Sequence, residues 1–318
     1  MYKLGIDLGG TNIVAAVVDN DKKIIAAGKI KTNTPRPAEE IVDDMIKAAE
    51  TACKNAGITM DNIDSIGVGS PGAIDPVNGV VCYANNLGFY NVPMKKIFEE
   101  RTGKPFYIEN DANAAAYGEY IAGAGKGTND FIAITLGTGV GGGVIIGGKI
   151  FSGSNCAGAE LGHTVICIDG EMCTCGRQGC WEAYASATAL IRQTRQAMIK
   201  YPDSKMWELC DGKLENVSGI TAFNAMREGD EAGKRVVDRY IEYVAIGVAN
   251  NINIFQPDML CIGGGISKEG DTLINPIREF VKGENYARNI EKKTEIRAAA
   301  LGNDAGIIGA AFLCELYK

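Results

Sequence analysis

A strand, a glycine turn and a second strand occur twice in this chain, and this repeat constrains its fold more than any other feature. The opening "IDLGGTNIVAAVV" aligns without a gap with "ITLGTGVGGGVII", which pairs Ile6–Val18 with Ile134–Ile146. Each copy is followed later by an apolar strand pattern that ends in glycines, "IGVGSPG" and "LCIGGGIS". Such internal similarity is typical of a duplicated α/β unit. We therefore expect two similar lobes around a cleft, a smaller one of residues 1–111 and about 302–318 and a larger one of residues 112–301.

The remaining pattern predicts ordinary α/β elements. Short apolar runs separated by Gly, Asn and Asp predict three antiparallel strands within the first 32 residues. Apolar residues at helical spacing predict helices over 38–56, about 181–200 and about 230–255. "DSIGVGSPG" and "KPFYIEN" predict strands that run into loops, and an Ala-rich helix begins near Asp111. "TEIRAAAL" and "DAGIIGAAFLCELY" predict a last strand and a closing helix.

The bulk properties argue against several classes of protein. A formal net charge of −7 provides no basic surface for a nucleic acid partner. No run of about 18 apolar residues is long enough to span a membrane, and the opening residues do not have the pattern of a secretory signal. We expect a cytoplasmic protein with no nucleic-acid or membrane partner, in which the 10 cysteines form no disulfide framework.

The two glycine turns, "DLGGTN" and "LGTGVGGG", are candidates for phosphate binding. Successive N–H groups in such turns form a concave anion site, and glycine has no side chain to block it. One loop alone is more simply a tight hairpin, but two aligned loops, one with Asp7 and Thr11 beside its glycines, favour a nucleotide's phosphates. Gly137, Gly139 and Gly142 also fit a dinucleotide fingerprint, and we reject that interpretation because a strand pattern follows where a helix is required.

Two aspartates are candidates for the chemistry of the site. Asp111 in "IENDANA" stands where a strand ends and a helix begins, which is the usual place for reactive groups in open α/β sheets. On the residues alone, Asp111 is more simply a helix N-cap. Asp7 is a candidate ligand for Mg²⁺, directly or through water, and its alternative role is to cap the first turn.

Three cysteines within eight residues, "CTCGRQGC", follow the single histidine of the chain. Cys173, Cys175 and Cys180 with His163 make a set of three sulfurs and one nitrogen, which is typical of a closed tetrahedral zinc site. The alternative is three idle thiols, which the tight spacing disfavours. A closed site leaves no position for an activated water, so the predicted zinc is structural.

Six motifs, in order along nearly the whole chain, resemble the ROK family of sugar kinases. They are "DLGGTN", "SPGAID", "ENDANAAAYGE", "TLGTGVGGG", "GAELGH" and "CTCGRQGCWE". The resemblance implies the actin-like ATPase fold, which is two lobes of the ribonuclease-H type and agrees with the duplication above. It also agrees with a structural zinc in the larger lobe.

The resemblance implies a kinase that uses ATP and Mg²⁺ to phosphorylate the 6-hydroxyl of a hexose, with glucose as the first candidate. It places the catalytic base at Asp111 and a sugar-binding amide at Asn110. The sugar contacts that it implies are Gly72, Asn86, Asn110, Asp111, Glu160, His163 and Glu182. The nucleotide contacts are Asp7, Gly9, Gly10, Thr11, Asn12, Thr138, Gly139, Gly264 and Gly265. Without the resemblance, Glu160 and Glu182 are more simply solvated surface charges.

Several alternatives stay open within this interpretation. N-acetylmannosamine, fructose, mannose or allose are alternative sugars, and Phe89 replaces the tryptophan that is usual in the glucokinase-like members. The family also contains sugar-responsive repressors, which carry a DNA-reading segment before the first glycine turn. Here that strand begins at residue 2 or 3, so we expect an enzyme rather than a regulator. Its relatives are commonly dimers or tetramers, which implies a homo-oligomer.

Overall fold

The computed structural model describes residues 2–317 and divides into two compact units. Unit 1 comprises the residues up to 133, residues 143–159 and the residues from 299 onward; unit 2 comprises residues 134–142 and 160–298. This grouping takes unit 1 beyond the boundary expected at residue 111. The cause is that α3 (Asp111–Ala122) packs against α9 (Ala305–Ala311) and against β4 (Ile63–Ser70), both in unit 1.

Two five-stranded sheets have the same strand order, which confirms the duplication. The first runs β3-β2-β1-β4-β8 and the second β11-β10-β9-β12-β13. The aligned glycine turns join equivalent strands, because β1 ends at Leu8 and β9 at Leu136, and these residues are paired in the sequence alignment. The strands of the first sheet are β1 (Tyr2–Leu8), β2 (Asn12–Val18), β3 (Ile24–Lys31), β4 and β8 (Phe106–Asn110). Those of the second are β9 (Phe131–Leu136), β10 (Val140–Ile146), β11 (Lys149–Ile150), β12 (Met259–Gly263) and β13 (Glu295–Ala298).

The helices agree with the predicted spacing where the apolar pattern is long. Helix α1 (Ala38–Asn55) confirms the prediction over 38–56, and α7 (Glu231–Phe255) confirms that over 230–255, with Asp230 as its N-cap. The helix expected over 181–200 is interrupted at Ser186, which is extended and caps Ala189 N–H through its hydroxyl at 3.1 Å. Two helices result, α4 (Glu182–Ala185) and α5 (Ala187–Lys200).

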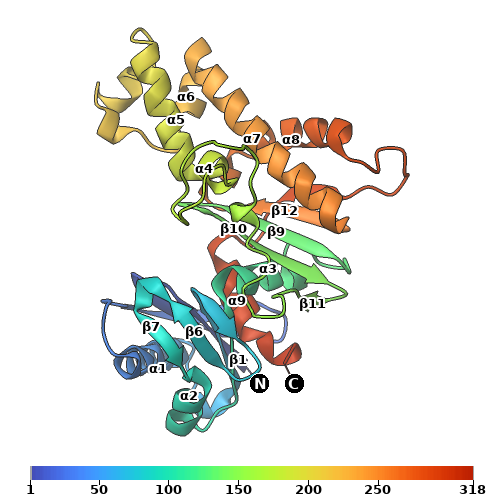
Figure 1. Ribbon diagram of the computed structural model, residues 1–318. Coiled ribbons are helices and arrows are strands. Elements are labelled where there is room, and N and C mark those ends of the chain that lie inside the picture. The colour runs from blue at the N-terminus through green and yellow to red at the C-terminus, as the bar shows by residue number, and fades with distance from the viewer. Residues whose placement is uncertain (1, 318) are drawn as a thin grey trace. The chain divides into compact units, whose positions relative to one another are not determined.

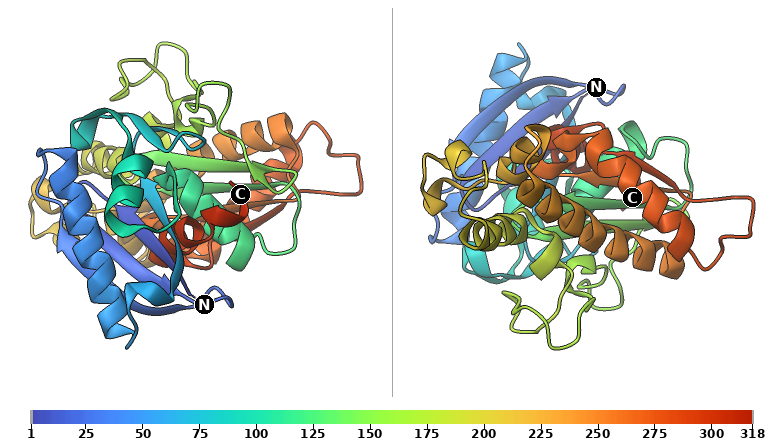
Figure 2. Two further views of the ribbon diagram at one scale, coloured as in Figure 1. Left: turned by 90° about the horizontal axis from the view of Figure 1, so that it is seen from below. Right: turned by 90° about the horizontal axis from the view of Figure 1, so that it is seen from above.

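Several elements have no counterpart in the sequence prediction. A small antiparallel sheet consists of β5 (Ala73–Asp75), β6 (Val80–Ala84) and β7 (Phe89–Val92). Helices α2 (Met94–Thr102), α6 (Thr221–Arg227) and α8 (Asp271–Glu284) were also missed, and α8 contains Pro276, which conceals its helical pattern. In unit 2, α7 packs against α5, α6 and α8 (Figures 1 and 2).

The first sheet of unit 1 packs helices on both faces. On one face, Leu4, Ile6 and Leu8 belong to a buried core that also holds Ile41 and Met45 of α1. Because side chains alternate across a strand, the intervening residues of β1, which include Gly5, face the other side of the sheet. A Cβ on Gly5 would lie 2.0 Å from the carbonyl oxygen of Ile307, so α9 rests directly on the backbone of β1.

Helix α9 also packs very closely against α3. A Cβ on Gly118 of α3 would lie 2.0 Å from Ala305 O, and a Cβ on Gly309 of α9 would lie 1.8 Å from Ala114 O. The two helices therefore meet through glycine, with no side chain between their backbones. The chain entering α9 is held by the buried carboxylate of Glu119, which accepts hydrogen bonds from Ala300 N at 3.0 Å and Leu301 N at 2.7 Å.

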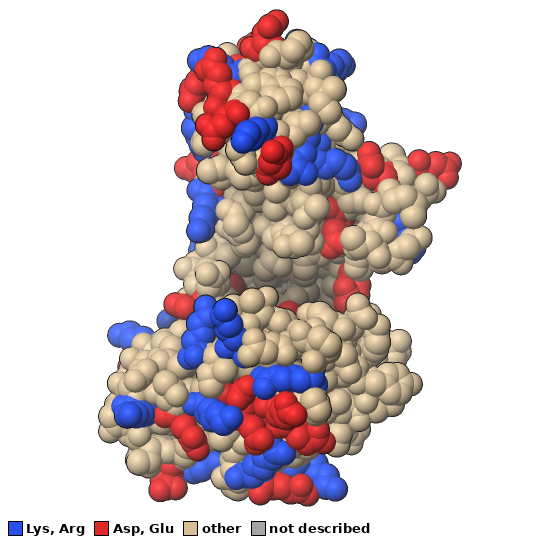
Figure 3. All heavy atoms as spheres, turned by 90° about the vertical axis from the view of Figure 1, so that its left-hand side faces the viewer, with Lys and Arg blue, Asp and Glu red and all other residues tan. Residues whose placement is uncertain are grey.

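The face of the molecule that Figure 3 draws carries mixed charge, because Lys and Arg side chains are interspersed there with Asp and Glu side chains. Between residues 2 and 317, no helix combines the length and the apolar character needed to cross a bilayer.

The glycine contact of α9 yields a matched pair of stability predictions. Gly309→Ala should lower the free energy of unfolding by about 1–3 kcal/mol, because the added methyl overlaps the Ala114 carbonyl. Gly306→Ala in the same helix places its methyl where nothing lies within 4 Å, and it should raise stability by about 0.5–1 kcal/mol. Urea midpoints measure both changes, and equal midpoints for the two variants would contradict the close contact.

Candidate functional site

The first glycine turn, between β1 and β2, has its carbonyl groups held on one side. Thr32 Oγ1 donates to Gly9 O at 2.6 Å and Thr34 Oγ1 donates to Gly10 O at 3.2 Å. In a planar trans peptide, the N–H of the next residue points opposite to the carbonyl. The N–H groups of Gly10 and Thr11 therefore point away from the threonines, which is the orientation that an anion needs.

The second turn, between β9 and β10, has the same polarity by different means. Ala187 N donates to Gly137 O and Thr188 Oγ1 donates to Thr138 O, each at 2.8 Å, from the first turn of α5. The N–H groups of Thr138 and Gly139 consequently point to the opposite side. These positions are equivalent to Gly10 and Thr11 in the sequence alignment.

The glycines that follow β12 adjoin the second turn within unit 2. Gly264 has φ of 87°, and a Cβ there would lie 2.3 Å from Leu136 O at the end of β9. Gly265 begins a short 3-10 helix and is exposed. The structure thus brings together four of the predicted nucleotide residues in unit 2, namely Thr138, Gly139, Gly264 and Gly265.

The junction of β8 and α3 carries the predicted catalytic residue, and the N-cap of α3 is its neighbour. The side chain of Asn110 accepts hydrogen bonds from Ala112 N at 2.9 Å and Asn113 N at 3.2 Å. Asp111 is the first residue of the helix and shares the Ala112 N–H at 2.9 Å. The interpretation of Asp111 as the N-cap is therefore wrong, because Asn110 fills that position and leaves an Asp111 oxygen for other contacts.

The two candidate site aspartates, Asp111 and Asp7, both have raised pKa values. Although Asp111 is open to solvent, the surrounding atoms raise its pKa by desolvation, against the hydrogen bond from Ala112 N–H. Burial, and then the charge of Asp111, raise the pKa of Asp7 from 3.8 to about 6. Asp7 lies within β1, opposite Val14 of β2, and not in the turn, which disfavours the alternative role of capping that turn.

The predicted sugar residues of unit 1 lie beside this junction. Asn110 Nδ2 donates to Gly72 O at 3.0 Å. Gly72 has φ of 102°, and a Cβ there would meet Tyr83 O at 2.1 Å, so only glycine suits this position. Asn86 is exposed in a short 3-10 helix, with its amide nitrogen 3.6 Å from the Cβ position of Gly10. Asn12 begins β2, and its carbonyl accepts Gly9 N at 2.9 Å.

The histidine and the three cysteines come together in unit 2. One ligand atom of each of His163, Cys173, Cys175 and Cys180 lies within 4.8 Å of all the others. Cys173 Sγ is 3.6 Å from His163 Nδ1, and Cys175 Sγ is 3.7 Å from Cys180 Sγ. In a tetrahedral zinc site the bonds are about 2.3 Å to sulfur and 2.0–2.1 Å to nitrogen. The ligand atoms are then about 3.6 Å apart for a sulfur and a nitrogen, and about 3.8 Å apart for two sulfurs. The donor set and its spacing therefore fit zinc.

Glu182 connects the cysteine segment to the second glycine turn. Its Oε2 accepts Val140 N at 3.0 Å, and its Oε1 accepts the hydroxyl of Thr174 at 3.2 Å. A Cβ on Gly139 would lie 2.2 Å from Glu182 Oε2, so the carboxylate rests against the turn. Glu160, in contrast, is exposed just before the short helix that carries His163.

Sequence reasoning missed the residues that support these groups. Thr32, Thr34 and Thr188 hold the carbonyls of the turns, and Glu109 accepts Asn110 N at 2.7 Å. The sequence "KTNTP" contains the two threonines of the first turn but gives no sign of their partners, which lie more than twenty positions away.

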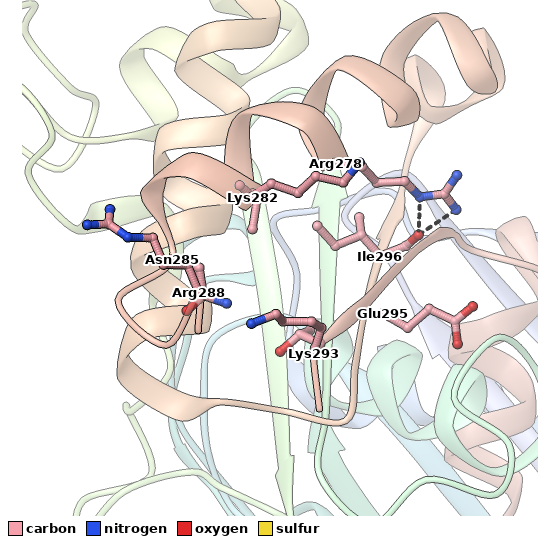
Figure 4. Close-up of a pocket in the computed structure, with 9 residues that line it drawn as sticks. Arg278, Lys282, Asn285, Arg288, Lys293, Glu295 and Ile296 are labelled. Carbon is pink, nitrogen blue, oxygen red and sulfur yellow. Dashed lines mark hydrogen bonds between the residues drawn. The ribbon is translucent and has the colours of Figure 1, made fainter. Parts of the chain in front are cut away.

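A pocket of about 440 Å³ between α8 and β13 contains none of the predicted site residues (Figure 4). The guanidinium of Arg278 donates to Ile296 O at 2.9 and 2.7 Å. Lys282 pairs with Glu279 at 2.5 Å, and Lys293 donates to Ala287 O at 2.8 Å. The cationic groups at this pocket are thus engaged by the protein itself.

Comparison with known proteins identifies the family to which this chain is similar. The model of the ROK family matches residues 3–316. A glucokinase of Streptomyces coelicolor is 39% identical, over 98% of this chain and 97% of its own length. A xylose repressor of Caldicellulosiruptor bescii is 31% identical, over 96% of this chain and 77% of its own length. The crystal structure of a ROK family glucokinase from Streptomyces griseus with glucose and AMPPNP has a TM-score of 0.81 and 38% identity, covering 98% of this chain and 99% of that one.

The chain belongs to the ROK family. This result confirms the resemblance found in the sequence and, with it, the α/β fold of the actin-like ATPase type that the resemblance implied.

The raised pKa of Asp7 predicts that this residue destabilises the free protein. The folded form binds more protons than the unfolded form between about pH 4 and 6, so this group's contribution to stability falls as the pH rises through that window. Without nucleotide or magnesium, Asp7→Asn should gain up to about 3 kcal/mol in unfolding free energy at pH 8 and little at pH 4. Chemical denaturation at the two pH values measures this difference.

Asp75 provides a control, because its pKa is shifted in the opposite direction to that of Asp7. Hydrogen bonds from the side chain and backbone of Asn78 lower its pKa, so Asp75→Asn should lose stability at pH 8. A loss of stability at pH 8 in Asp7→Asn as well would refute the burial argument for Asp7.

Proposed function

We propose that this protein is an ATP-dependent glucokinase, which transfers the γ-phosphate of ATP to the 6-hydroxyl of glucose. The observation that carries the proposal is the β8–α3 junction, where Asn110 caps the helix and leaves Asp111 available as a base. The family assignment supports it, because the glucokinase relatives match this chain over nearly their whole length.

Asp111 accepts the proton of the sugar hydroxyl as the hydroxyl oxygen attacks the γ-phosphorus. The O–H bond breaks towards Asp111, a P–O bond forms to the sugar, and the bond to the β-phosphate breaks, which releases ADP. The raised pKa of Asp111 suits this role, because a general base is most effective when its pKa is close to the working pH. Such catalysis contributes about 10²- to 10⁴-fold in rate.

The glycine turns supply the phosphate contacts in this proposal. Each presents two N–H groups from a turn whose carbonyls are fixed elsewhere, so these donors need little reorganisation when charge develops on the phosphates. Gly264 and Gly265 extend the nucleotide contacts in unit 2.

Asp7 is the residue that we assign to magnesium. Its carboxylate is partly buried beside a second carboxylate, and this proximity raises its pKa in the absence of a cation, which suits a site for a divalent ion. Bound Mg²⁺ would neutralise phosphate charge, and Asp7 would hold it directly or through water.

The sugar contacts that we propose are Gly72, Asn86, Asn110, Glu160, His163 and Glu182. Asn110 and Glu182 already make protein hydrogen bonds, so they would present a fixed geometry to the sugar, with the carboxylate oxygens of Glu182 retaining further acceptor capacity. Ligation of His163 through Nδ1 leaves Nε2 as a hydrogen-bond donor. Discrimination between glucose and other hexoses rests on small displacements among these groups.

The cysteine cluster is proposed as a structural zinc site. Burial, and then the neighbouring thiols of Cys175 and Cys173, raise the pKa of Cys180 to about 12, and a bound cation would favour its thiolate form. His163, Cys173, Cys175 and Cys180 would be the four ligands, with no open position for a water. Through Thr174 and Glu182, the same ion would steady the second glycine turn.

On the family resemblance, we also propose that the protein works in the cytoplasm as a homo-oligomer and supplies sugar phosphate to glycolysis.

A coupled assay with Mg-ATP and a panel of hexoses tests the kinase proposal. Glucose should give the highest kcat/KM among glucose, mannose, fructose, allose and N-acetylmannosamine. Asp111→Asn should stay folded, with turnover reduced by roughly 10²-fold or more, because it lacks the proton acceptor. Asp203→Asn, at an exposed aspartate outside the site, is the control and should retain full turnover.

The outcomes separate the alternatives. Near wild-type turnover in Asp111→Asn would remove Asp111 from the role of base. Binding of sugar without phosphoryl transfer to any hexose would instead favour a sugar-sensing protein of the repressor kind. A higher kcat/KM for N-acetylmannosamine or another hexose would retain the kinase and change its substrate.

Metal analysis tests the zinc proposal. Purified protein should contain about one zinc per chain. Cys175→Ser should lose the metal and melt about 5 °C or more below the parent, because structural zinc contributes folding energy. Cys167→Ser removes an exposed thiol outside the cluster and should keep both metal and melting temperature. Metal-free protein with unchanged melting temperature and full activity would exclude the zinc site.

A further inference from the structure

A buried carboxylate lies two residues before Asp111. Glu109 ends β8 and is 1% exposed, and a charged group so deeply buried is tolerated only when it is well hydrogen-bonded. Its Oε1 accepts Asn110 N at 2.7 Å and Asn113 Nδ2 at 3.1 Å, while its Oε2 accepts the hydroxyl of Tyr317 at 2.5 Å. Three donors therefore surround one buried carboxylate.

These hydrogen bonds involve residues on both sides of Asp111 in the sequence. Asn110 precedes it and Asn113 follows within the first turn of α3, and Glu109 holds both through the same oxygen. The cap by Asn110 then ties the start of the helix to Gly72. The backbone next to Asp111 is thus held by the hydrogen bonds of Glu109 to Asn110 and Asn113, and by the cap that Asn110 provides.

Tyr317 is the one of these three donors that lies far from this segment in the sequence. It follows α9 and the short helix Leu313–Glu315, and α9 is packed on β1, β4 and α3 through glycine contacts. The segment that precedes Tyr317 is therefore closely packed in unit 1, and Tyr317 contacts Glu109 from there. Its hydroxyl holds Oε2, which leaves Oε1 directed at Asn110 and Asn113.

Among residues 2–317, two further titratable groups act on this pair from other elements. The thiol of Cys156, in the segment after β11, interacts electrostatically with both Glu109 and Tyr317, and the phenol of Tyr117 on α3 interacts in the same way with Tyr317. Burial raises the pKa of Glu109, against the hydrogen bonds from Tyr317, Asn110 and Asn113. Loss of the Tyr317 donor would therefore favour the protonated form of Glu109.

We propose that Tyr317 is a positioning residue for the reaction, which acts through Glu109 to fix the β8–α3 junction and thereby the orientation of Asp111. The inference rests on the proposed role of Asp111 as the base. Protonated Glu109 is a poorer acceptor for Asn110 N and Asn113 Nδ2, so the junction loses its fixed geometry, and small misplacement of a catalytic group reduces rate steeply.

Tyr317→Phe tests the proposal, because it removes one hydroxyl and keeps the ring. We expect kcat to fall by about 10-fold with both KM values within about 2-fold. The acid limb of the kcat profile should move to higher pH by about 0.5 unit or more, and activity should recover as the pH rises and Glu109 ionises. Tyr286→Phe, at a tyrosine that is 94% exposed, is the matched control and should match the parent.

A double-mutant cycle with Glu109→Gln completes the test. Because Tyr317 acts through Glu109, Tyr317→Phe should change kcat little in the Glu109→Gln background. Additive effects, an unchanged pH profile, or a fall in kcat at all pH values without a shift of the acid limb would overturn the proposal. If Glu109→Gln does not fold, the profile of Tyr317→Phe decides alone. Parent protein that phosphorylates no sugar would reject the proposed function itself, and the positioning role with it.

Discussion

The close contact of α9 with the first sheet and with α3 is the constraint on which unit 1 depends. The carbonyl of Ile307 lies where a side chain on Gly5 would be, and the carbonyl of Ala114 lies where one on Gly309 would be. No other residue type permits such an approach without movement of the backbone. Because β1 carries Asp7 and α3 carries Asp111, this contact sets the positions of both aspartates before any ligand is present.

The residues around Asp111 carry most of the hydrogen bonds that hold the β8–α3 junction. Asn110 caps the helix, and Glu109 accepts hydrogen bonds from the backbone of Asn110 and the side chain of Asn113. Glu119 ties the far end of α3 to the chain entering α9. Asp111 itself makes only one of these internal contacts. Because Asn110 and not Asp111 caps the helix, Asp111 can have a perturbed pKa and change its protonation state while the cap stays in place.

The sequence was most informative where its pattern repeats. The alignment of two glycine turns predicted the equivalent strand ends at Leu8 and Leu136, and the long apolar stripes predicted α1 and α7. The cysteine cluster was also predictable, because its spacing is short and its donors are chemically distinctive. Local signals of this kind need no knowledge of distant contacts.

The prediction failed where a local choice depends on distant partners. Both Asn110 and Asp111 are good caps, and the hydrogen bond from Asn110 to Gly72 helps to place Asn110 in that position. The contact of Glu182 with Val140 joins residues that are 42 positions apart, and that of Tyr317 with Glu109 joins residues 208 apart. No periodicity or motif records these pairs.

The two glycine turns orient their carbonyl groups in the same way with different donors, and they therefore differ in their sensitivity to mutation. The carbonyls of the first turn are held by two threonine side chains, so a single substitution at Thr32 or Thr34 releases one of them. In the second turn, a backbone N–H of α5 holds Gly137, and no substitution except proline removes that donor. The second turn still depends on one side chain, because Thr188 holds the carbonyl of Thr138. Side-chain substitutions can therefore release both carbonyls of the first turn but only one carbonyl of the second.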